Sequence, residues 1–297
     1  MIKRERHSDF GRIGRQLKQL PGNPMFDPAS KRKVVLITGA SSGLGRAAAE
    51  RLAGRGHTVF GTSRHPSGDL GKVQMISLDV TNDESVENAL RNVMAKAGRI
   101  DVLVNNAGSG LCGAVEDTSI EEAHLQMEIN FFGPARMIRA VLPQMRRQGG
   151  GRIITVSSLA GLAALPFQAY YSATKFALEA FNEALRLELI GSNIESTTIC
   201  PGDFVTGFTD SRRIAKAAYP DVHQRQFRTT LAIYERNERE GADPRHMAKM
   251  VERLVNRPDV GVRYMVGDIR QRFGIALKRI LPANVFERIL RAVYAIR

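Results

Sequence analysis

The chain has very little cysteine, no tryptophan and no long apolar run. Its 297 residues include only Cys112 and Cys200, and neither stands in the spacing of a disulfide framework or a metal-ligand cluster. No stretch has the roughly 20 consecutive apolar residues that a membrane-spanning helix needs, and the N-terminus lacks the apolar core of a signal peptide. These absences predict a cytoplasmic protein without a metal site.

The central body also lacks an excess of charge of either sign. The formal net charge is +13, but residues 1–33 and residues 270–297 each contribute +6, and the 236 residues between them are nearly neutral. Basic terminal segments of this kind bind nucleic acid, bind an anionic membrane surface or are simply solvated. The sequence contains no motif that reads nucleic acid, so a nucleic-acid partner is not predicted.

From Lys33 onward, short apolar runs alternate with stretches of helical length. Continuous apolar runs are typical of strands that are buried on both faces, and the alternation indicates βαβ units. The sequence therefore predicts one doubly wound α/β domain, with a bend in its third helix near Gly133–Pro134 because proline removes a backbone donor. The predicted strands are Val34–Thr38, Thr58–Ser63, Val73–Leu78, Val102–Asn105, Arg152–Ser157, Ile194–Cys200 and Arg263–Val266, and the predicted helices are roughly 43–55, 83–97, 119–147, 170–190 and 243–256.

A glycine-rich turn connects the first predicted strand to the first predicted helix. Gly39, Gly43 and Gly45 have the spacing G-x-x-x-G-x-G. Glycines here let the backbone approach a pyrophosphate, whose charge is met by the helix N-terminus. The strand before and the helix after supply the context that this motif requires, although a simple tight turn is the alternative. The predicted cofactor contacts in this turn are Gly39, Ser41, Ser42, Gly43, Leu44 and Gly45.

The end of the second strand indicates which dinucleotide binds. The segment Phe60–His65 contains no acidic residue for the ribose hydroxyls of NAD, and Ser63 is followed by Arg64. A 2′-phosphate attracts a cation and repels a carboxylate. This pattern favours NADP(H) over NAD(H), unless Arg64 is only a solvated loop charge.

Tyr171 and Lys175 are candidates for proton transfer. They stand four residues apart in a predicted helix, which places them on one face. A tyrosine with a pKa near 10 is a poor base, but a neighbouring ammonium favours the phenolate. Such a tyrosine gives a proton to a carbonyl oxygen while hydride arrives at carbon, or takes it in reverse. Ser158, just after a strand, is placed to hold the same oxygen. By itself a Tyr–Lys pair is more often a surface pair.

The order of the motifs resembles that of the short-chain dehydrogenase/reductase family over about residues 33–267. TGASSGLG, Asn105–Gly108, Ser158, Tyr-x-x-x-Lys and Pro201–Gly202 follow one another along the chain. The resemblance implies an α/β fold with a Rossmann-type sheet of seven parallel strands. It also implies an oxidoreductase that transfers hydride between NADP(H) and a ketone or secondary alcohol.

The resemblance assigns residues to specific roles. It implies a catalytic tetrad of Asn130, Ser158, Tyr171 and Lys175, in which Asn130 holds a water that links the lysine to solvent. It places Asp79 near the adenine, Asn106 near a ribose and Thr206 near the carboxamide. Asp79 and Asn106 could instead cap a helix and a turn. The implied cofactor contacts outside the glycine turn are Ser63, Arg64, Asp79, Val80, Asn106, Ala107, Gly108, Tyr171, Lys175, Pro201, Gly202 and Thr206.

The segment after the last motif predicts the substrate class. Residues 203–241 stand where the family builds a variable substrate lid, and their aromatic residues among many charges suit a lipophilic substrate such as a steroid, a retinoid or a long-chain keto lipid. A polar surface loop is the alternative. Two other activities remain open: a non-enzymatic NADP-binding sensor or scaffold, and a sugar-nucleotide epimerase. The domain prediction is a basic extension (1–32), a catalytic domain (33–269) and a basic tail (270–297).

The tail is predicted to be amphipathic. Val285, Phe286, Ile289, Leu290 and Val293 form one apolar stripe, with arginines off that stripe. Such a helix lies on an anionic membrane surface, on its own domain or on a second subunit. The family resemblance implies a homodimer or homotetramer, and a membrane contact would place the protein at the inner membrane face.

Overall fold

The structure, a computed structural model, describes residues 32–216 and 220–296. Its main sheet has seven strands in the order β3-β2-β1-β4-β6-β7-β9, and every neighbouring pair is parallel. The predicted Rossmann-type fold and its seventh strand are therefore confirmed. The strands are β1 Val34–Ile37, β2 Thr58–Ser63, β3 Gln74–Ser77, β4 Val102–Asn105, β6 Gly151–Val156, β7 Ile194–Pro201 and β9 Arg263–Val266.

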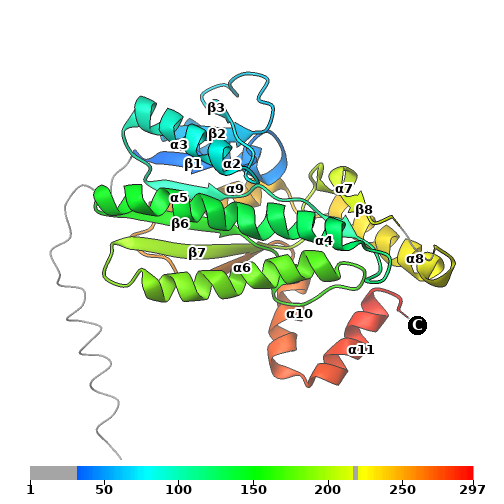
Figure 1. The fold of residues 1–297 in the computed structure, drawn as a ribbon. Helices are drawn as coiled ribbons and strands as arrows, with labels where there is room; N and C mark the ends of the chain where they lie inside the picture. Colours follow the sequence, from blue (N-terminus) through cyan, green and yellow to red (C-terminus); the bar gives the residue numbers. More distant parts are fainter. Residues whose placement is uncertain (1–31, 217–219, 297) are drawn as a thin grey trace, which may run out of the picture.

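Helices cover both faces of this sheet (Figure 1). Alternate residues of a strand point to opposite faces, so Val35 and Ile37 of β1 join the core beneath α2 and α9, whereas Leu36 joins the core beneath α3, α5 and α6. The predicted bounds of strands and helices agree with the structure to within one or two residues. The helices are α2 Gly43–Gly54, α3 Asp83–Ala97, α4 Ile120–Met127, α5 Gly133–Arg147, α6 Ala169–Glu188 and α9 Pro244–Asn256.

The predicted bend in the third helix is a π-helical turn, Glu128–Phe132, between α4 and α5. Pro134 lies at the start of α5 and has no N–H to donate to the carbonyl of Asn130, four residues earlier. The helix is wider at this turn, because the Gly133 N–H donates to the carbonyl of Glu128, five residues earlier, rather than to a carbonyl four residues earlier. Single π-helical turns of this kind are frequent at functional sites.

The segment predicted as a lid contains structure that the sequence did not indicate. Its helices are α7 Phe208–Ser211 and α8 Pro220–Arg239. Between them, β8 Arg213–Ile214 pairs in parallel with β5 Leu111–Cys112 and joins the lid to the strand-end loop after β4. Cys112 is buried and free, as is Cys200.

The tail forms two helices, α10 Ile269–Ile280 and α11 Ala283–Val293. They project from one edge of the domain as a hairpin (Figure 1). Ile275 and Phe286 pack with Ala163 in a small separate core. Of the predicted basic extension, only Arg32 falls within the described residues, and in the described part of the chain no helix is long and apolar enough to cross a membrane.

Candidate active site

The glycine turn between β1 and α2 fits a pyrophosphate. Gly39 and Gly43 have φ values of +66° and +55°, which side-chain-bearing residues rarely adopt. A Cβ on Gly45 would lie 2.3 Å from the Gly39 carbonyl oxygen, so only glycine fits there. Ser42 at the N-cap makes no side-chain hydrogen bond to the helix, and the first N–H groups of α2 thus keep their capacity to bind an anion. Ser41 is exposed beside it, whereas Leu44 packs into the core.

Asn106 braces this turn from the neighbouring strand end. Its Nδ2 donates to the carbonyls of Thr38 and Gly39 at 3.0 and 2.9 Å. The Thr38 hydroxyl in turn accepts the N–H groups of Asn106 and Ala107. Asn106 therefore stabilises the loop that would hold the cofactor, in agreement with the turn-capping alternative, and its predicted contact with a ribose stays a prediction.

Arg64 and Asp79 lie close enough at the ends of β2 and β3 to interact electrostatically. Hydrogen bonds from the backbone and hydroxyl of Thr81 lower the pKa of Asp79, and the charges of Arg64 and Arg136 lower it further. Arg64 is exposed, and its guanidinium forms no ion pair within the described residues. Val80 is buried, while the Ser63 hydroxyl accepts the N–H of His65.

Ser158, Tyr171 and Lys175 come together where β6 ends and α6 begins. The Lys175 side chain crosses beneath the tyrosine, with Nζ 5.7 Å from its ring centroid, and donates to the Val156 carbonyl at 3.1 Å. The hydroxyl of Ser158 hydrogen-bonds the Tyr171 phenol. A substrate oxygen that meets Tyr171 would thus also meet Ser158.

Asn130 lies in the π-helical turn and is 1% exposed. Its Oδ1 accepts the N–H of Ser109 at 2.8 Å, and its Nδ2 donates to the Ser109 carbonyl at 2.9 Å and toward Thr174 at 3.3 Å. A Cβ on Gly108 would lie 3.3 Å from Asn130 Oδ1 and 3.9 Å from Lys175 Nζ. Asn130 and Lys175 therefore both lie beside Gly108, and Lys175 in turn lies beside Tyr171.

Burial sets the protonation of the pair. It raises the pKa of Tyr171 to about 12, against the opposing effect of the Ser158 hydrogen bond. It lowers the pKa of Lys175 to about 8, while Cys200 and the buried Glu179 favour the ammonium form. The neutral phenol is therefore the form present at neutral pH, and this form is a proton donor rather than a base.

The loop after β7 returns to the glycine turn. Pro201 ends the strand, and the Gly202 N–H donates to the Val266 carbonyl at 2.8 Å. Thr206 lies over the turn, because a Cβ on Gly43 would be 3.5 Å from the Thr206 Cβ. Of the three predicted contacts, Thr206 therefore lies beside the glycine turn, whereas Gly202 packs against Gln271 and Leu159.

The segment predicted as a lid places aromatic and charged groups beside Tyr171. The Phe208 ring lies 6.1 Å from the Tyr171 ring, and the Arg212 guanidinium lies 5.6 Å from the Phe208 ring. Arg212 is ion-paired with Glu238 of α8. Its Nη1 is buried and has no hydrogen-bond partner within the described residues. Sequence reasoning missed Arg212 and Glu238, which stand 26 residues apart in a stretch rich in charge.

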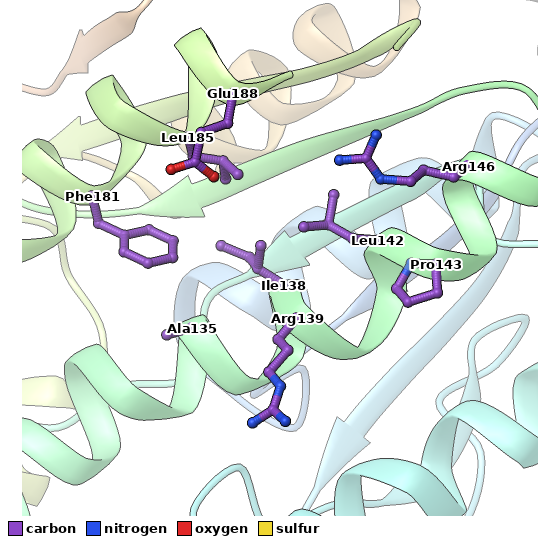
Figure 2. A pocket seen from close by; sticks show the side chains of 9 residues that line it. All are labelled: Ala135, Ile138, Arg139, Leu142, Pro143, Arg146, Phe181, Leu185 and Glu188. Carbon is purple, nitrogen blue, oxygen red and sulfur yellow. The ribbon is translucent and has the colours of Figure 1, made fainter.

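Two surface hollows lie outside the tetrad. An apolar groove of about 330 Å³ runs between α5 and α6 (Figure 2). A second hollow of about 450 Å³ lies beside the start of α6 and the end of α11. The residues that line the groove are Ala135, Ile138, Arg139, Leu142, Pro143, Arg146, Phe181, Leu185 and Glu188, and those that line the second hollow are Ala114, Val115, Glu116, Pro166, Phe167, Gln226 and Ile296.

Comparison with protein families identifies the family of this chain. A model described as short chain dehydrogenase matches residues 33–217. This chain belongs to the short-chain dehydrogenase family. The matched range contains the glycine turn, Asn130, Ser158, Tyr171 and Lys175. Membership establishes an oxidoreductase family with a nicotinamide cofactor, as the motif order implied.

Individual relatives of this short-chain dehydrogenase carry more specific names. It is 44% identical over 266 residues to 3-ketodihydrosphingosine reductase of Bacteroides thetaiotaomicron, covering 89% of this chain and 99% of the relative. It is 34% identical to bovine retinol dehydrogenase 8, covering 76% and 79%. A short-chain dehydrogenase structure from Streptomyces avermitilis superposes with a TM-score of 0.75 at 32% identity, over 89% and 98% of the chains. An alcohol dehydrogenase from Thermococcus sibiricus complexed with 5-hydroxy-NADP superposes with 0.64 at 27% identity, over 80% and 97%.

Proposed function

We propose that this protein reduces a ketone on a long-chain lipid to a secondary alcohol with NADPH. The observation that carries the proposal is the convergence of Ser158, Tyr171 and Lys175 where β6 ends and α6 begins. A relative named 3-ketodihydrosphingosine reductase that matches nearly end to end supports the substrate class. A retinol dehydrogenase relative supports a lipophilic substrate more broadly, so a retinoid is the second candidate class.

The nicotinamide cofactor, when bound, supplies the hydride. Tyr171 then donates its phenolic proton to the carbonyl oxygen, which is the role that its raised pKa favours. Ser158 holds the same oxygen through its hydroxyl. The Lys175 ammonium stabilises the phenolate that remains, because opposite charges attract strongly in a buried site. Asn130 fixes the loop at Ser109 and so maintains the position of Gly108 beside Lys175.

The preference for NADPH rests on Arg64. Its guanidinium is exposed and without an ion pair in the described chain, at the end of β2 where an NAD site has a carboxylate. An arginine binds phosphate through two parallel hydrogen bonds. We infer that Arg64, with Ser63 beside it, binds the 2′-phosphate, while Asp79 and Val80 border the adenine.

The charged groups near Tyr171 suit a lipid with a polar head. Glu238 and Asp203 raise the pKa of Tyr171 and Arg212 lowers it, so all three act electrostatically at the reacting end of the site. The unpartnered Nη1 of Arg212 is a buried donor that a substrate hydroxyl would satisfy. The carboxylates of Asp203 and Glu238 would bind an amino group on the head of the lipid substrate. We infer that residues 203–241 form the substrate lid and bind the polar head group of the lipid. The hydrocarbon chain of the lipid would then contact apolar surface.

The groove of Figure 2 is the surface we assign to a homodimer. Its apolar lining on α5 and α6 lies away from the tetrad, and Phe132 and Leu187 near it are 48% and 71% exposed. Contiguous exposed apolar surface on a soluble protein marks an interaction site. Two copies of this face would cover each other by two-fold symmetry.

A substrate panel tests the proposed activity. The purified protein is mixed with NADPH and with a long-chain 2-amino-3-ketone, a ketosteroid, a retinal or a short soluble ketone, and NADPH consumption is followed by absorbance. The highest kcat/KM is expected with the long-chain amino ketone. Turnover of none of these carbonyl compounds by an intact, NADPH-binding protein would contradict the reductase assignment and favour the sensor.

A further inference from the structure

The first tail helix, α10, has one face that packs on the domain. Gln271 hydrogen-bonds Asp203, and Lys278 donates to the Leu162 carbonyl. Ile275, between them, is 6% exposed and belongs to a buried apolar cluster. These residues recur at i, i+4 and i+7, which defines one face of a helix.

The opposite face of α10 is apolar as well, yet nothing in the described chain covers it. Ile269, Phe273 and Ile280 recur at i, i+4 and i+11 and are 68%, 62% and 79% exposed. An amphipathic helix that only packs on its domain has polar residues on the far side. A large exposed apolar stripe therefore indicates a further contact.

The second tail helix repeats this division. Phe286 and Leu290 pack toward the domain, whereas Val285, Ile289 and Val293 are 37%, 37% and 52% exposed. The apolar stripe that the sequence predicts on α11 thus divides into two rows. One row is buried in the protein and the adjacent row remains open to solvent.

Arginines border both open stripes. Arg270 and Arg272 flank the stripe on α10, Arg279 lies at the end of that helix and Arg288 lies midway along α11. All four are exposed and make no ion pair within the described residues. Residues 269–296 contain six Lys/Arg and one acidic residue. Apolar side chains bordered by cations match the boundary between lipid tails and anionic headgroups.

We propose that the α10–α11 hairpin is a membrane-docking surface for anionic lipid bilayers. The open stripes enter the headgroup boundary, and the bordering arginines bind lipid phosphates. A second copy fits less well, because protein interfaces have few charges at their centre and two hairpins of the same positive charge repel each other. The projection of the hairpin from the domain leaves its tip accessible to a flat surface (Figure 1).

The position of the hairpin connects this contact to the proposed lipid substrate. The hollow of about 450 Å³ is lined by Ile296 after α11 and by Phe167 just before α6. The Thr230 hydroxyl of α8 donates to the Tyr294 carbonyl at 3.2 Å. Docking would therefore place lipid beside the lid, and this consequence alone rests on the proposed function.

Vesicle sedimentation tests the docking surface without substrate or cofactor. The full-length protein is mixed at low salt with vesicles of equal parts phosphatidylglycerol and phosphatidylcholine, or of phosphatidylcholine alone. We expect binding to the anionic vesicles and partial release by salt, since the apolar contact is not screened. Phe273→Asp/Ile280→Asp and Arg270→Glu/Arg272→Glu should each weaken binding by about tenfold or more.

Matched variants elsewhere on the surface serve as controls. Ile120→Asp/Leu125→Asp replaces two exposed apolar residues of α4, and Arg91→Glu/Lys96→Glu reverses two exposed charges on α3. Both should bind vesicles like the wild type, because they leave the α10–α11 hairpin unchanged. The basic residues 1–31 are present in every variant and do not distinguish them. Melting temperatures measured in parallel establish that each variant is folded.

Three results would overturn the docking surface. The wild type could fail to bind anionic vesicles at low salt, or the tail and control variants could bind equally. In the third, Phe273→Asp/Ile280→Asp would change the oligomeric mass measured by light scattering and leave vesicle binding unaltered, which would make this face a contact between copies. None of these readouts requires turnover, so each is distinguishable from failure of the proposed reductase activity.

Discussion

Gln271 of the tail hydrogen-bonds Asp203 of the lid at both ends of its amide group. Its Oε1 accepts the backbone N–H of Asp203 at 3.1 Å, and its Nε2 donates to the carboxylate. The loop held in this way also contains Gly202 and leads to Thr206, which lies over the glycine turn. The start of the tail therefore supports a loop that leads to the candidate site.

Replacing Gln271 tests this support. In Gln271→Leu the Asp203 N–H and carboxylate lose their partner, and a buried polar group left without a partner destabilises by about 1–3 kcal/mol. We expect the free energy of unfolding in urea to fall by that amount and the KM for the cofactor to rise. Gln224→Leu, at an exposed position of α8, is the matched control. Equal stability of both variants would show that the hydrogen bonds contribute nothing.

Asp203 should make stability depend on pH. Burial raises the pKa of its carboxyl to about 6 from 3.8, so the folded state binds the proton more tightly than the unfolded state. The resulting stability is complete below about pH 4 and is lost as pH rises through about 6, a change of about 2–3 kcal/mol. Asp203→Asn should remove this dependence. As pH rises between those values, the unfolding free energy of the variant should therefore increase relative to that of the wild type. A difference that is constant with pH would refute the raised pKa.

Tyr171→Phe should strongly reduce turnover, because it removes the phenolic hydroxyl that carries the transferable proton. A loss of about 10²- to 10⁴-fold in kcat is expected for a missing general acid. NADPH affinity, measured by fluorescence titration, should stay within a few-fold. Tyr170→Phe is the control, since the neighbouring tyrosine has a different helical phase. Retention of most activity by Tyr171→Phe would exclude the proposed acid.

Lys175 should impose an alkaline limit on reduction. Burial lowers the pKa of its ammonium to about 8, and the cation that stabilises the Tyr171 phenolate is lost above that pH. The kcat/KM for ketone reduction, which reports the free enzyme, should therefore decline as pH rises through about 8. Lys175→Met should have low activity, weaker cofactor binding and no such titration. The same decline in both proteins would assign it to another group.

Arg64 should determine the preference between the two cofactors. The change Ser63→Asp with Arg64→Ala removes a cation and adds a carboxylate at the end of β2. A hydrogen bond to a charged group contributes about 1.5–3 kcal/mol, so the NADPH-to-NADH ratio of kcat/KM should fall about ten- to a hundredfold. Arg91→Ala, on the exposed face of α3, should leave the ratio unchanged. A ratio unaltered by the double change would mean that the 2′-phosphate binds elsewhere.

The amino-acid sequence by itself determined the sheet, the glycine turn and the candidate catalytic residues. Continuous apolar runs define buried strands through local hydrophobicity, and Tyr171 and Lys175 share a helical face because of their spacing alone. The bend after Asn130 was also predictable, since Pro134 removes a backbone donor wherever it occurs. Each of these signals lies within a few residues of the chain.

Only the tertiary structure decided how distant segments complete the site. Arg212 forms an ion pair with Glu238, and Gln271 hydrogen-bonds Asp203, 68 residues away. Many other charged or polar residues in these stretches could equally have been the partners, so the sequence does not single these pairs out. The stripe on α11 was visible in the sequence, but its division into a buried row at Phe286 and an open row at Ile289 was not. Local periodicity specifies which residues share a face, whereas the partner of that face depends on packing between segments that the sequence does not place together.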